Sequence, residues 1–221
     1  MLENLLKLRY QMRKNGSTQM KLYYAQNSRA VRVAWLLEEL RIDYEVEKFN
    51  LGDSAMREPE YLARHPMGRV PALEDGEVQL FESGAIIQYI LAKYGKGRFV
   101  PSIASTDFAD YLQWFHYAEG MIMPPMNTYV VETILLPPER RTEINVKRSI
   151  KLLGQMLKAV NTNLAEKEYL VGSELTGADF MTGHAVVMSQ RFGIDMSDKP
   201  HLPPYVERLT SRQAFQRASN K

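Results

Sequence analysis

Cysteine is absent from this chain of 221 residues. Its absence excludes disulfides, zinc sites built on thiolates, and every mechanism that uses a protein thiol as nucleophile or redox centre. An excess of one charge is also missing, because the formal net charge is only +2. No apolar run is long enough to span a bilayer, and no signal-peptide core precedes a small-residue cleavage site. We therefore expect a cytoplasmic protein with no nucleic-acid partner and no membrane contact.

The N-terminal stretch differs from the rest of the chain. Residues 1–19 are basic and weakly amphipathic, and they end in Gly-Ser-Thr-Gln, which is typical of a linker. A clear strand pattern begins only at Met20. We interpret residues 1–19 as an extension that is non-native or disordered, arising from a mis-assigned start before Met20 or from a foreign leader. The alternative is a basic amphipathic arm that touches a partner.

Residues 20–97 contain the elements of a thioredoxin-like domain in the order βαβ followed by ββα. The first helix is apolar on more than one side, so we expect it to be packed between a sheet and another element. Asp75-Gly76 is a strong hairpin signal between two short strands. The predicted strands span 21–25, 44–49, 71–74 and 78–81, and the predicted helices span 29–41 and a segment that ends before Gly95.

A stretch rich in Gly, Pro and Ser at 95–105 marks the domain boundary, and residues 106–221 read as an all-helical domain. Pro124-Pro125 must kink or end the first of its helices. A long helix comes next, and we expect the two to pack antiparallel. The apolar stripes are Phe108, Tyr111, Leu112, Phe115 and Ile122 in the first helix, and Val146, Ile150, Leu153, Leu157, Val160 and Leu164 in the second.

A capping box predicts where a later helix begins. Thr176 and Asp179 have the spacing at which each side chain reaches the other's backbone N–H, and Leu175 and Phe180 are placed as a hydrophobic staple. We therefore expect a helix from residue 177 to about residue 190.

Three short segments carry the candidate chemistry. In Phe81-Glu82-Ser83-Gly84 a strand passes directly into a helix, so Ser83 is either a plain helix cap or part of a carboxylate seat. Glu82 beside it would pair with an ammonium group and would repel a phosphate. A γ-glutamyl group carries a carboxylate and an ammonium side by side, so this junction suits an amino-acid head group.

The second segment is Arg69-Val70-Pro71, at the start of a strand. A proline is tolerated at the first residue of a strand, but a cis Val70–Pro71 bond would turn the Val70 amide and carbonyl toward an extended peptide ligand. The third segment, from Tyr23 to Arg29, joins the first strand to the first helix. Ser28 is either a simple cap or a hydroxyl donor that favours a thiolate at the helix N-terminus.

Together these segments resemble the cytosolic glutathione S-transferase family over nearly all of residues 20–221. The resemblance is carried by KLYYAQNSRAVRVAWLLEELRIDYE, HPMGRVPALEDG, LFESGAIIQYI and TGADF, in that order and spacing, and HYAEGMIMPPM is similar to a segment of bacterial and fungal members. It implies glutathione as co-substrate, a homodimer, and no metal. It also implies that glutathione is held by Val70, Glu82 and Ser83, with Pro71 in the cis form and Arg69 near the glycine carboxylate.

The departures from the family pattern narrow the mechanism. Classes that use a cysteine are excluded, and the Ser-rich motif of the maleylacetoacetate isomerase-like class is absent. The turn at 25–29 is shorter than in the Ser-type classes, so the sequence leaves open whether Ser28 or Tyr23 faces the glutathione sulfur. We favour Ser28 as the donor and keep Tyr23 as the alternative. Catalysis would consist largely of lowering the thiol pKa for attack on a hydrophobic electrophile.

The electrophile should bind between the domains. Trp114, Tyr117 and Met121 share a helix face that would line an apolar site, or they are ordinary core residues. His116 and Glu119, three residues apart, are interpreted as structural. The alternatives to conjugation are a glutathione- or protein-binding module without turnover, and a glutathione-dependent peroxidase, dehalogenase or lyase.

Overall fold

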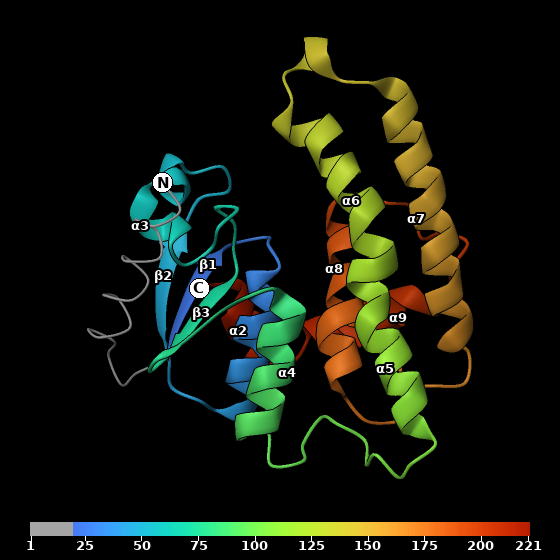
Figure 1. The fold of residues 1–221 in the computed structure, drawn as a ribbon. Helices are drawn as coiled ribbons and strands as arrows, with labels where there is room; N and C mark the ends of the chain where they lie inside the picture. Colours follow the sequence, from blue (N-terminus) through green and yellow to red (C-terminus); the bar gives the residue numbers. More distant parts are fainter. Residues whose placement is uncertain (1–19) are drawn as a thin grey trace. The chain divides into compact units, whose positions relative to one another are not determined.

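A computed structural model describes residues 20–221, and the predicted extension of residues 1–19 lies outside the described residues. The chain divides into two compact units, which Figure 1 shows in ribbon form. Residues 20–96 and 213–221 make up the first unit, and residues 97–212 make up the second. The predicted combination of a thioredoxin-like α/β domain and an all-helical domain is confirmed.

The first unit is built on a four-stranded mixed sheet with the strand order β2-β1-β3-β4. Strand β1 is parallel to β2 and antiparallel to β3, which is itself antiparallel to β4. The predicted hairpin turns at Gly76, whose φ of +60° glycine adopts without steric cost. The strands are β1 (Lys21–Ala25), β2 (Glu45–Phe49), β3 (Ala72–Asp75) and β4 (Val78–Phe81).

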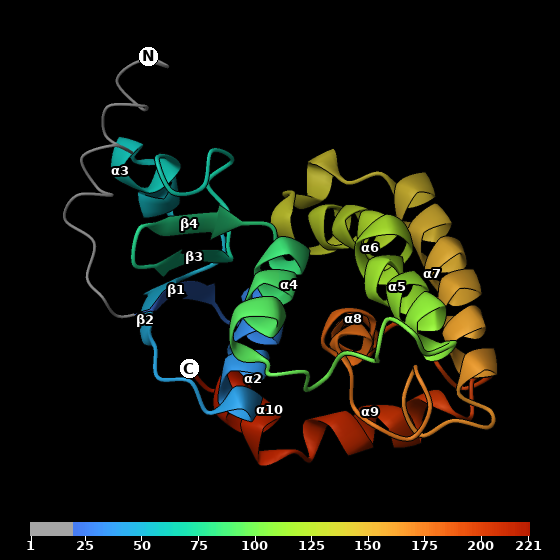
Figure 2. The same cartoon turned by 60° about the horizontal axis from the view of Figure 1, so that its bottom comes forward.

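Helices cover both faces of this sheet, and neighbouring residues of a strand point to opposite faces. On one face lie α2 (Ala30–Leu40) and α4 (Ser83–Tyr94), and α2 is buried along almost its whole length, as its all-round apolar pattern predicts. On the other face Tyr23 packs against Met56 and Tyr61. Those two residues belong to a 3₁₀ turn at Ser54–Arg57 and to α3 (Pro59–Leu62). Figure 2 shows α3 and the pair α2 and α4 on different sides of the strands.

The C-terminal helix α10 (Gln213–Ser219) packs against α2 of the first unit, although the sequence pattern grouped it with the helical domain. The Trp35 and Phe215 rings meet edge to face, with 5.1 Å between their centroids. The carboxylate of Glu38 accepts from Arg217 and pairs with Lys221, each at 2.6 Å. The predicted boundary missed this return because the partners of α10 lie far away in the sequence.

The second unit starts with a helical path that the double proline does not end. Helix α5 (Asp107–Tyr117) is followed by a π-helical turn at Ala118–Ile122, and α6 (Met123–Val130) carries both prolines in its first turn. The widened turn precedes the residues whose amide donors are missing, so the path continues. A second π-helical turn, Val131–Leu135, ends this path.

The predicted antiparallel partner is α7 (Glu143–Asn163). Near one end of the pair Glu132 accepts hydrogen bonds from the Thr142 amide and the Asn145 side chain, each at 2.7 Å. Further along, the Tyr117 hydroxyl donates to the carbonyl of Met156. The predicted stripe of α7 is wrong at Ile150, which is exposed, because Ser149 occupies the buried position.

One half of the predicted capping box is present. The Asp179 amide donates to the Thr176 carbonyl and not to its hydroxyl, so the threonine half is not formed. The Asp179 carboxylate accepts from the amide and the hydroxyl of Thr176 at 2.8 and 3.1 Å. It also accepts from the Leu170 amide and the Tyr205 hydroxyl, so one buried acid fastens several segments of the second unit. The helices involved are a π-helical turn (Asp179–Gly183), α8 (His184–Arg191) and α9 (Leu202–Thr210).

Candidate functional site

The sheet register gathers the three candidate segments at one end of the first unit. Tyr23 of β1 lies opposite Ala72 of β3, and Ala72 lies opposite Phe81 of β4. Pro71 directly precedes Ala72, and Glu82 directly follows Phe81. The end of β1, the start of β3 and the end of β4 therefore lie close together at the same end of the sheet.

His65 lies where these segments converge, and sequence reasoning missed it. Its buried ring lies 5.1 Å from that of Phe81, the residue before Glu82. Burial, followed by the positive charges of Arg69 and Arg29, lowers the pKa of His65. The imidazole is therefore neutral near pH 7, while the two arginines make this end of the sheet attractive to carboxylates.

The junction between β4 and α4 has an unusual backbone. Glu82 has a φ of +75°, a left-handed value that carries a steric cost for any residue with a Cβ. Its side chain is exposed, whereas Ser83, the first residue of α4, is only 3% exposed. The strained backbone thus turns a carboxylate outward beside a buried hydroxyl and the free N–H groups of a helix start.

Arg32 of α2 adds a charged group to this junction. Its side chain is fully buried, and its Nη1 donates to the Oγ of Ser83 at 3.3 Å. The sequence does mark Arg32 as unusual, because it is a cation within the otherwise apolar run AVRVAW. That run predicts only a core helix, since a helical pattern does not reveal which distant helix start a buried arginine faces.

The segment before β3 is fastened at several points. The Val70–Pro71 peptide bond is cis, as predicted. The Tyr61 hydroxyl donates to the carbonyl of Arg69 at 2.6 Å, while the Arg69 side chain is exposed. At Gly68, where φ is +55°, a Cβ atom would lie 2.3 Å from the carbonyl oxygen of Met56. Only glycine fits there, so the loop packs closely against the backbone of Met56. This close packing, together with the Tyr61 hydrogen bond, fixes the backbone that leads into Val70.

The turn between β1 and α2 holds the Ser28 hydroxyl in a local arrangement. Ser28 Oγ donates to the Ala25 carbonyl at 2.6 Å and accepts from the Ala30 amide at 3.1 Å. Asn27 takes the left-handed conformation that asparagine tolerates, with φ of +56°. The half-buried Ser28 therefore stabilises the turn that precedes α2, and its proton is directed at the Ala25 carbonyl of that turn.

Tyr23, the alternative donor, is completely buried. Its ring packs edge to face against Tyr61 at 5.5 Å, and its hydroxyl makes no hydrogen bond of normal geometry to any residue in the range 20–221. Burial, followed by the carboxylate of Glu74, raises the pKa of Tyr23 above the usual tyrosine range. The phenol is therefore neutral and enclosed.

The three residues predicted to line an electrophile site lie in the second unit and differ in exposure. Trp114 is 6% exposed, and its ring lies 5.0 Å from that of the half-buried Tyr117. The Tyr117 hydroxyl is already bound to Met156 of α7. Met121, in the π-helical turn, is 43% exposed. Of the three, Met121 thus has the most exposed apolar side chain.

Residues 20–221 contain no group of three or more acidic or histidine side chains arranged to hold a metal ion. Over the same range, no helix has the length and apolar character needed to cross a membrane.

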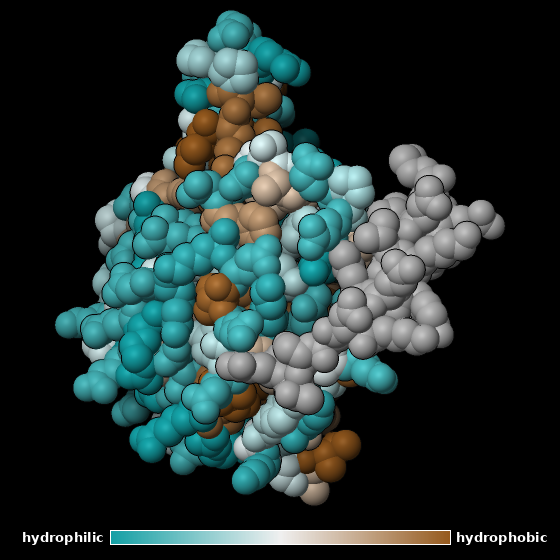
Figure 3. Space-filling model, turned by 90° about the vertical axis from the view of Figure 1, so that its left-hand side faces the viewer, coloured by the Kyte–Doolittle hydropathy of each residue, from teal (hydrophilic) through white to brown (hydrophobic). Residues whose placement is uncertain are grey.

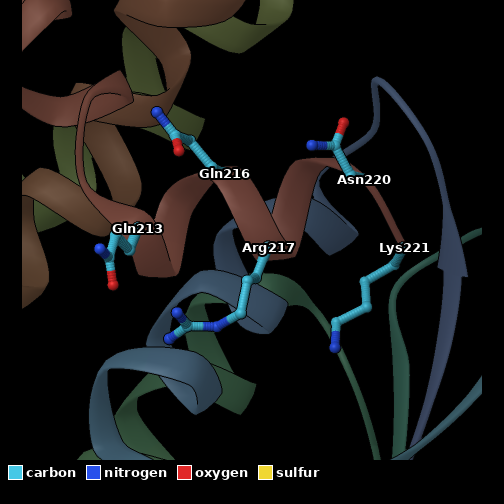
Figure 4. A pocket seen from close by; sticks show the side chains of 5 residues that line it. All are labelled: Gln213, Gln216, Arg217, Asn220 and Lys221. Carbon is cyan, nitrogen blue, oxygen red and sulfur yellow. The ribbon is translucent and has the colours of Figure 1, made fainter.

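A polar hollow lies at the C-terminus of the first unit. Figure 4 shows its lining residues, which are Gln213, Gln216, Arg217, Asn220 and Lys221. Its two cations, Arg217 and Lys221, pair with Glu38 of α2 and so help to hold α10 against α2.

Comparison with known proteins covers both units. Residues 18–92 match the profile of the glutathione S-transferase N-terminal domain, and residues 122–213 match that of the C-terminal domain. Glutathione S-transferase 4 of Zea mays is 32% identical over 193 residues, which is 83% of each chain. Glutathione S-transferase 1 of Saccharomyces cerevisiae is 27% identical and covers 91% of this chain and 94% of its own.

Solved structures give the same result. A glutathione transferase from Phanerochaete chrysosporium, crystallised with oxidized glutathione, superposes with a TM-score of 0.82 at 25% identity, covering 92% of this chain and 95% of its own. A glutathione S-transferase from Actinobacillus pleuropneumoniae has a TM-score of 0.75 at 26% identity, with 91% and 92% covered.

Proposed function

The chain belongs to the glutathione S-transferase family, and on that premise we propose that it is an enzyme that binds glutathione and activates its thiol for attack on hydrophobic electrophiles. The observation that carries this proposal is the junction of Glu82 and Ser83. An exposed carboxylate on a strained backbone stands beside a buried hydroxyl at a helix start. Strain of this kind persists where it serves a site, and the charges match a γ-glutamyl group.

The head group of glutathione has a partner for each of its charges. The Glu82 carboxylate pairs with the ammonium, while the Ser83 hydroxyl and the first N–H groups of α4 receive the α-carboxylate. At the other end of the tripeptide, Arg69 pairs with the glycine carboxylate, because its side chain is exposed and its backbone is held by Tyr61. The Val70 backbone beside cis Pro71 forms hydrogen bonds with the central cysteine residue of glutathione.

The thiol is activated by the Ser28 hydroxyl and by the N-terminus of α2. A free thiol has a pKa of about 8.5, so lowering it by about one to two units supplies most of the nucleophile at neutral pH. Ser28 must turn its proton away from the Ala25 carbonyl to reach the sulfur. That exchange is favourable, since a hydrogen bond to a thiolate is roughly twice as strong as one to a neutral carbonyl. The enclosed phenol of Tyr23 makes it the weaker candidate.

The electrophile would contact Met121, with Trp114 and Tyr117 behind it as a rigid apolar support. The support for this assignment is the exposure of Met121 together with the ring contact between the other two residues. Flexible methionine side chains adapt to apolar ligands of different shape, which suits a broad substrate range.

A second candidate function is a glutathione-binding module without turnover. The specific observation in its favour is that the Ser28 hydroxyl already donates to Ala25, so thiol activation requires a rearrangement. Dehalogenase, peroxidase or lyase chemistry would use the same thiolate and differ only in the electrophile.

We also propose a homodimer. The segments at the end of α6 and the start of α7 carry exposed apolar side chains, which are Val131, Ile134, Leu135 and Ile144. Figure 3 shows a brown apolar area below the tip at the top of the view. A second copy would remove these side chains from water. Light scattering at micromolar concentration should give twice the chain mass of 25.4 kDa, and a value near 25.4 kDa would refute the dimer.

The test of the function combines binding and turnover. The purified protein should be retained on immobilised glutathione and should conjugate 1-chloro-2,4-dinitrobenzene, and a Glu82→Gln variant should lose retention with little change in folding. Retention without turnover of any of a panel of electrophiles, peroxides and haloalkanes would select the binding module. No retention of the parent protein would refute the glutathione site.

A further inference from the structure

The contact between Arg32 and Ser83 determines how the serine hydroxyl can be used. A hydroxyl has one proton to donate and lone pairs that accept. Arg32 Nη1 donates to Ser83 Oγ at 3.3 Å, and both side chains are buried. Because a guanidinium has no acceptor, the serine proton cannot return to Arg32, and it must point to another group.

Within residues 20–221, Ser83 Oγ accepts from Arg32, and its own proton makes no hydrogen bond to a protein acceptor. The free backbone groups at the start of α4 are N–H donors, which cannot accept this proton, and the Glu82 carbonyl is already bonded to the Ile86 amide. This proton therefore remains available to an acceptor that arrives from outside. Ser28 differs, because its proton is already donated to the Ala25 carbonyl.

We propose that Arg32 is a positioning residue that orients the Ser83 hydroxyl toward the α-carboxylate of the γ-glutamyl group. This inference rests on the proposed function, because it names the ligand of that same site. Its Nη1 occupies one lone pair of the serine oxygen, so that the proton faces the ligand. This arrangement favours an anion at Ser83.

A purely structural arginine would only hold α2 against α4. The two roles differ in what happens when the serine hydroxyl or the ligand carboxylate is removed. A positioning role requires both groups, so its effect on binding disappears without either one. A structural role requires neither, so its effect persists.

The experiment is a double-mutant cycle with two ligands. Arg32→Met and Arg32→Lys are each made in the parent chain and in Ser83→Ala, and binding is measured by isothermal titration. The ligands are glutathione and 4-aminobutyryl-cysteinylglycine, which lacks only the α-carboxylate. Arg32→Met should raise the glutathione Kd by about tenfold in the parent chain and by no more than about twofold in Ser83→Ala. For the second ligand the effect should be within about twofold in both backgrounds.

Arg32→Lys should recover part of the loss, since it keeps the cation but not the planar donor. The rate of conjugation at saturating glutathione should be unchanged, because the head group is bound alike before and during the reaction. Trp35→Phe is the matched control. This residue is a buried side chain of the same helix that contacts Phe215, so its loss should lower Tm without changing the glutathione Kd.

Three results would overturn the proposal. The first is an equal loss from Arg32→Met with and without the serine hydroxyl, and the second is an equal loss for both ligands. The third is failure of both Arg32 variants to fold, which would assign the arginine to the core. If the parent's glutathione affinity is indifferent to Glu82 and Ser83, the proposed function itself fails, and that result is distinct from these three.

Discussion

Ser28 and Ser83 stand at comparable places in the first unit, each at the point where a strand passes into a helix, yet their hydroxyls are used in opposite ways. Ser28 gives its proton to the Ala25 carbonyl and is half-buried. Ser83 accepts from Arg32 and is almost fully buried. The Ser28 hydroxyl must therefore leave the Ala25 carbonyl before its proton can reach a ligand. The Ser83 hydroxyl can donate to a ligand without giving up an existing hydrogen bond.

In the proposed function, this difference assigns glutathione binding to Ser83 and thiol activation to Ser28. A donor that gives up no existing bond costs nothing to use and suits a head group that is held throughout the reaction. A donor that exchanges partners suits a group whose charge appears only when the thiol ionises, because the exchange becomes favourable at that moment. We therefore assign affinity to the Ser83 junction and rate to the Ser28 turn.

The largest expected effect is at Glu82. Glu82→Ala should weaken glutathione binding by about 30- to 900-fold, or ~2–4 kcal/mol, since it removes the partner of the ammonium. Glu82→Gly is the matched variant, because it also removes the carboxylate but relieves the strain of a φ of +75°. Calorimetry should find equal losses of affinity, and thermal unfolding should find the glycine variant more stable. Affinity within about twofold of the parent for either variant would refute this seat for the head group.

Ser28→Ala should lower the conjugation rate by about ten- to a thousandfold, or ~1.4–4 kcal/mol, through loss of the donor to the thiolate. The absorbance of the bound thiolate should appear at higher pH than in the parent, because the thiol pKa rises when the donor is lost. Tyr23→Phe should leave the rate and the titration unchanged. If Tyr23→Phe shows both effects and Ser28→Ala neither, the donor has been misassigned.

Tyr61→Phe tests the loop that carries Val70. The variant loses the hydrogen bond to the Arg69 carbonyl, so glutathione should bind about three- to tenfold more weakly, or ~1 kcal/mol. The rate at saturating glutathione should not change. An unchanged Kd would mean that the loop is held without this contact.

The smallest expected effect concerns α10, which supports the Ser28 turn. The Tyr24 hydroxyl and the Gln26 amide donate to the carbonyls of Ala218 and Ser219. Burial opposes ionisation of Glu38, but hydrogen bonds from Arg217 and Lys221 outweigh it and lower the pKa of the acid. A lowered folded-state pKa gives stability that is present above the unfolded pKa of about 4.3 and is lost as pH falls through the folded value.

Glu38→Gln should therefore cost about 0.5–1 kcal/mol of unfolding free energy at pH 7 and nothing below the folded-state pKa. Because α10 contacts the β1–α2 turn, the variant should reduce the conjugation rate more than the glutathione affinity. Urea unfolding at pH 7 and at low pH measures the first effect, and steady-state kinetics measure the second. An equal cost at both pH values would show that the charge on Glu38 is not what docks α10.

The order of elements was predictable from sequence because it follows from local patterns. The hairpin at Gly76, the capping box of Thr176 and Asp179, and the buried helix at 30–40 each have a signal within a few residues. The prolines at 124 and 125 were a correct sign of irregularity, but the π-helical turn at 118–122 that accommodates them depends on packing against α7.

The site was predictable only in part. The segments around Ser28, Val70 and Glu82 were identified because each joins a strand to another element. The direction in which each serine hydroxyl points could not be predicted. For Ser28 it depends on the Ala25 carbonyl, and for Ser83 it depends on Arg32 of another helix. The return of α10 to the first unit was missed for the same reason, because contacts between Glu38 and Arg217 leave no local pattern.

The most direct test is a titration of glutathione into Ser83→Ala and Ser28→Ala side by side. We expect Ser83→Ala to weaken binding by about five- to 30-fold, or ~1–2 kcal/mol, with some loss of thermal stability from the missing helix cap. Ser28→Ala should keep its Kd within about threefold of the parent while losing rate. The reverse order of affinities, with Ser28→Ala the weaker binder, would contradict the division between a binding junction and an activating turn.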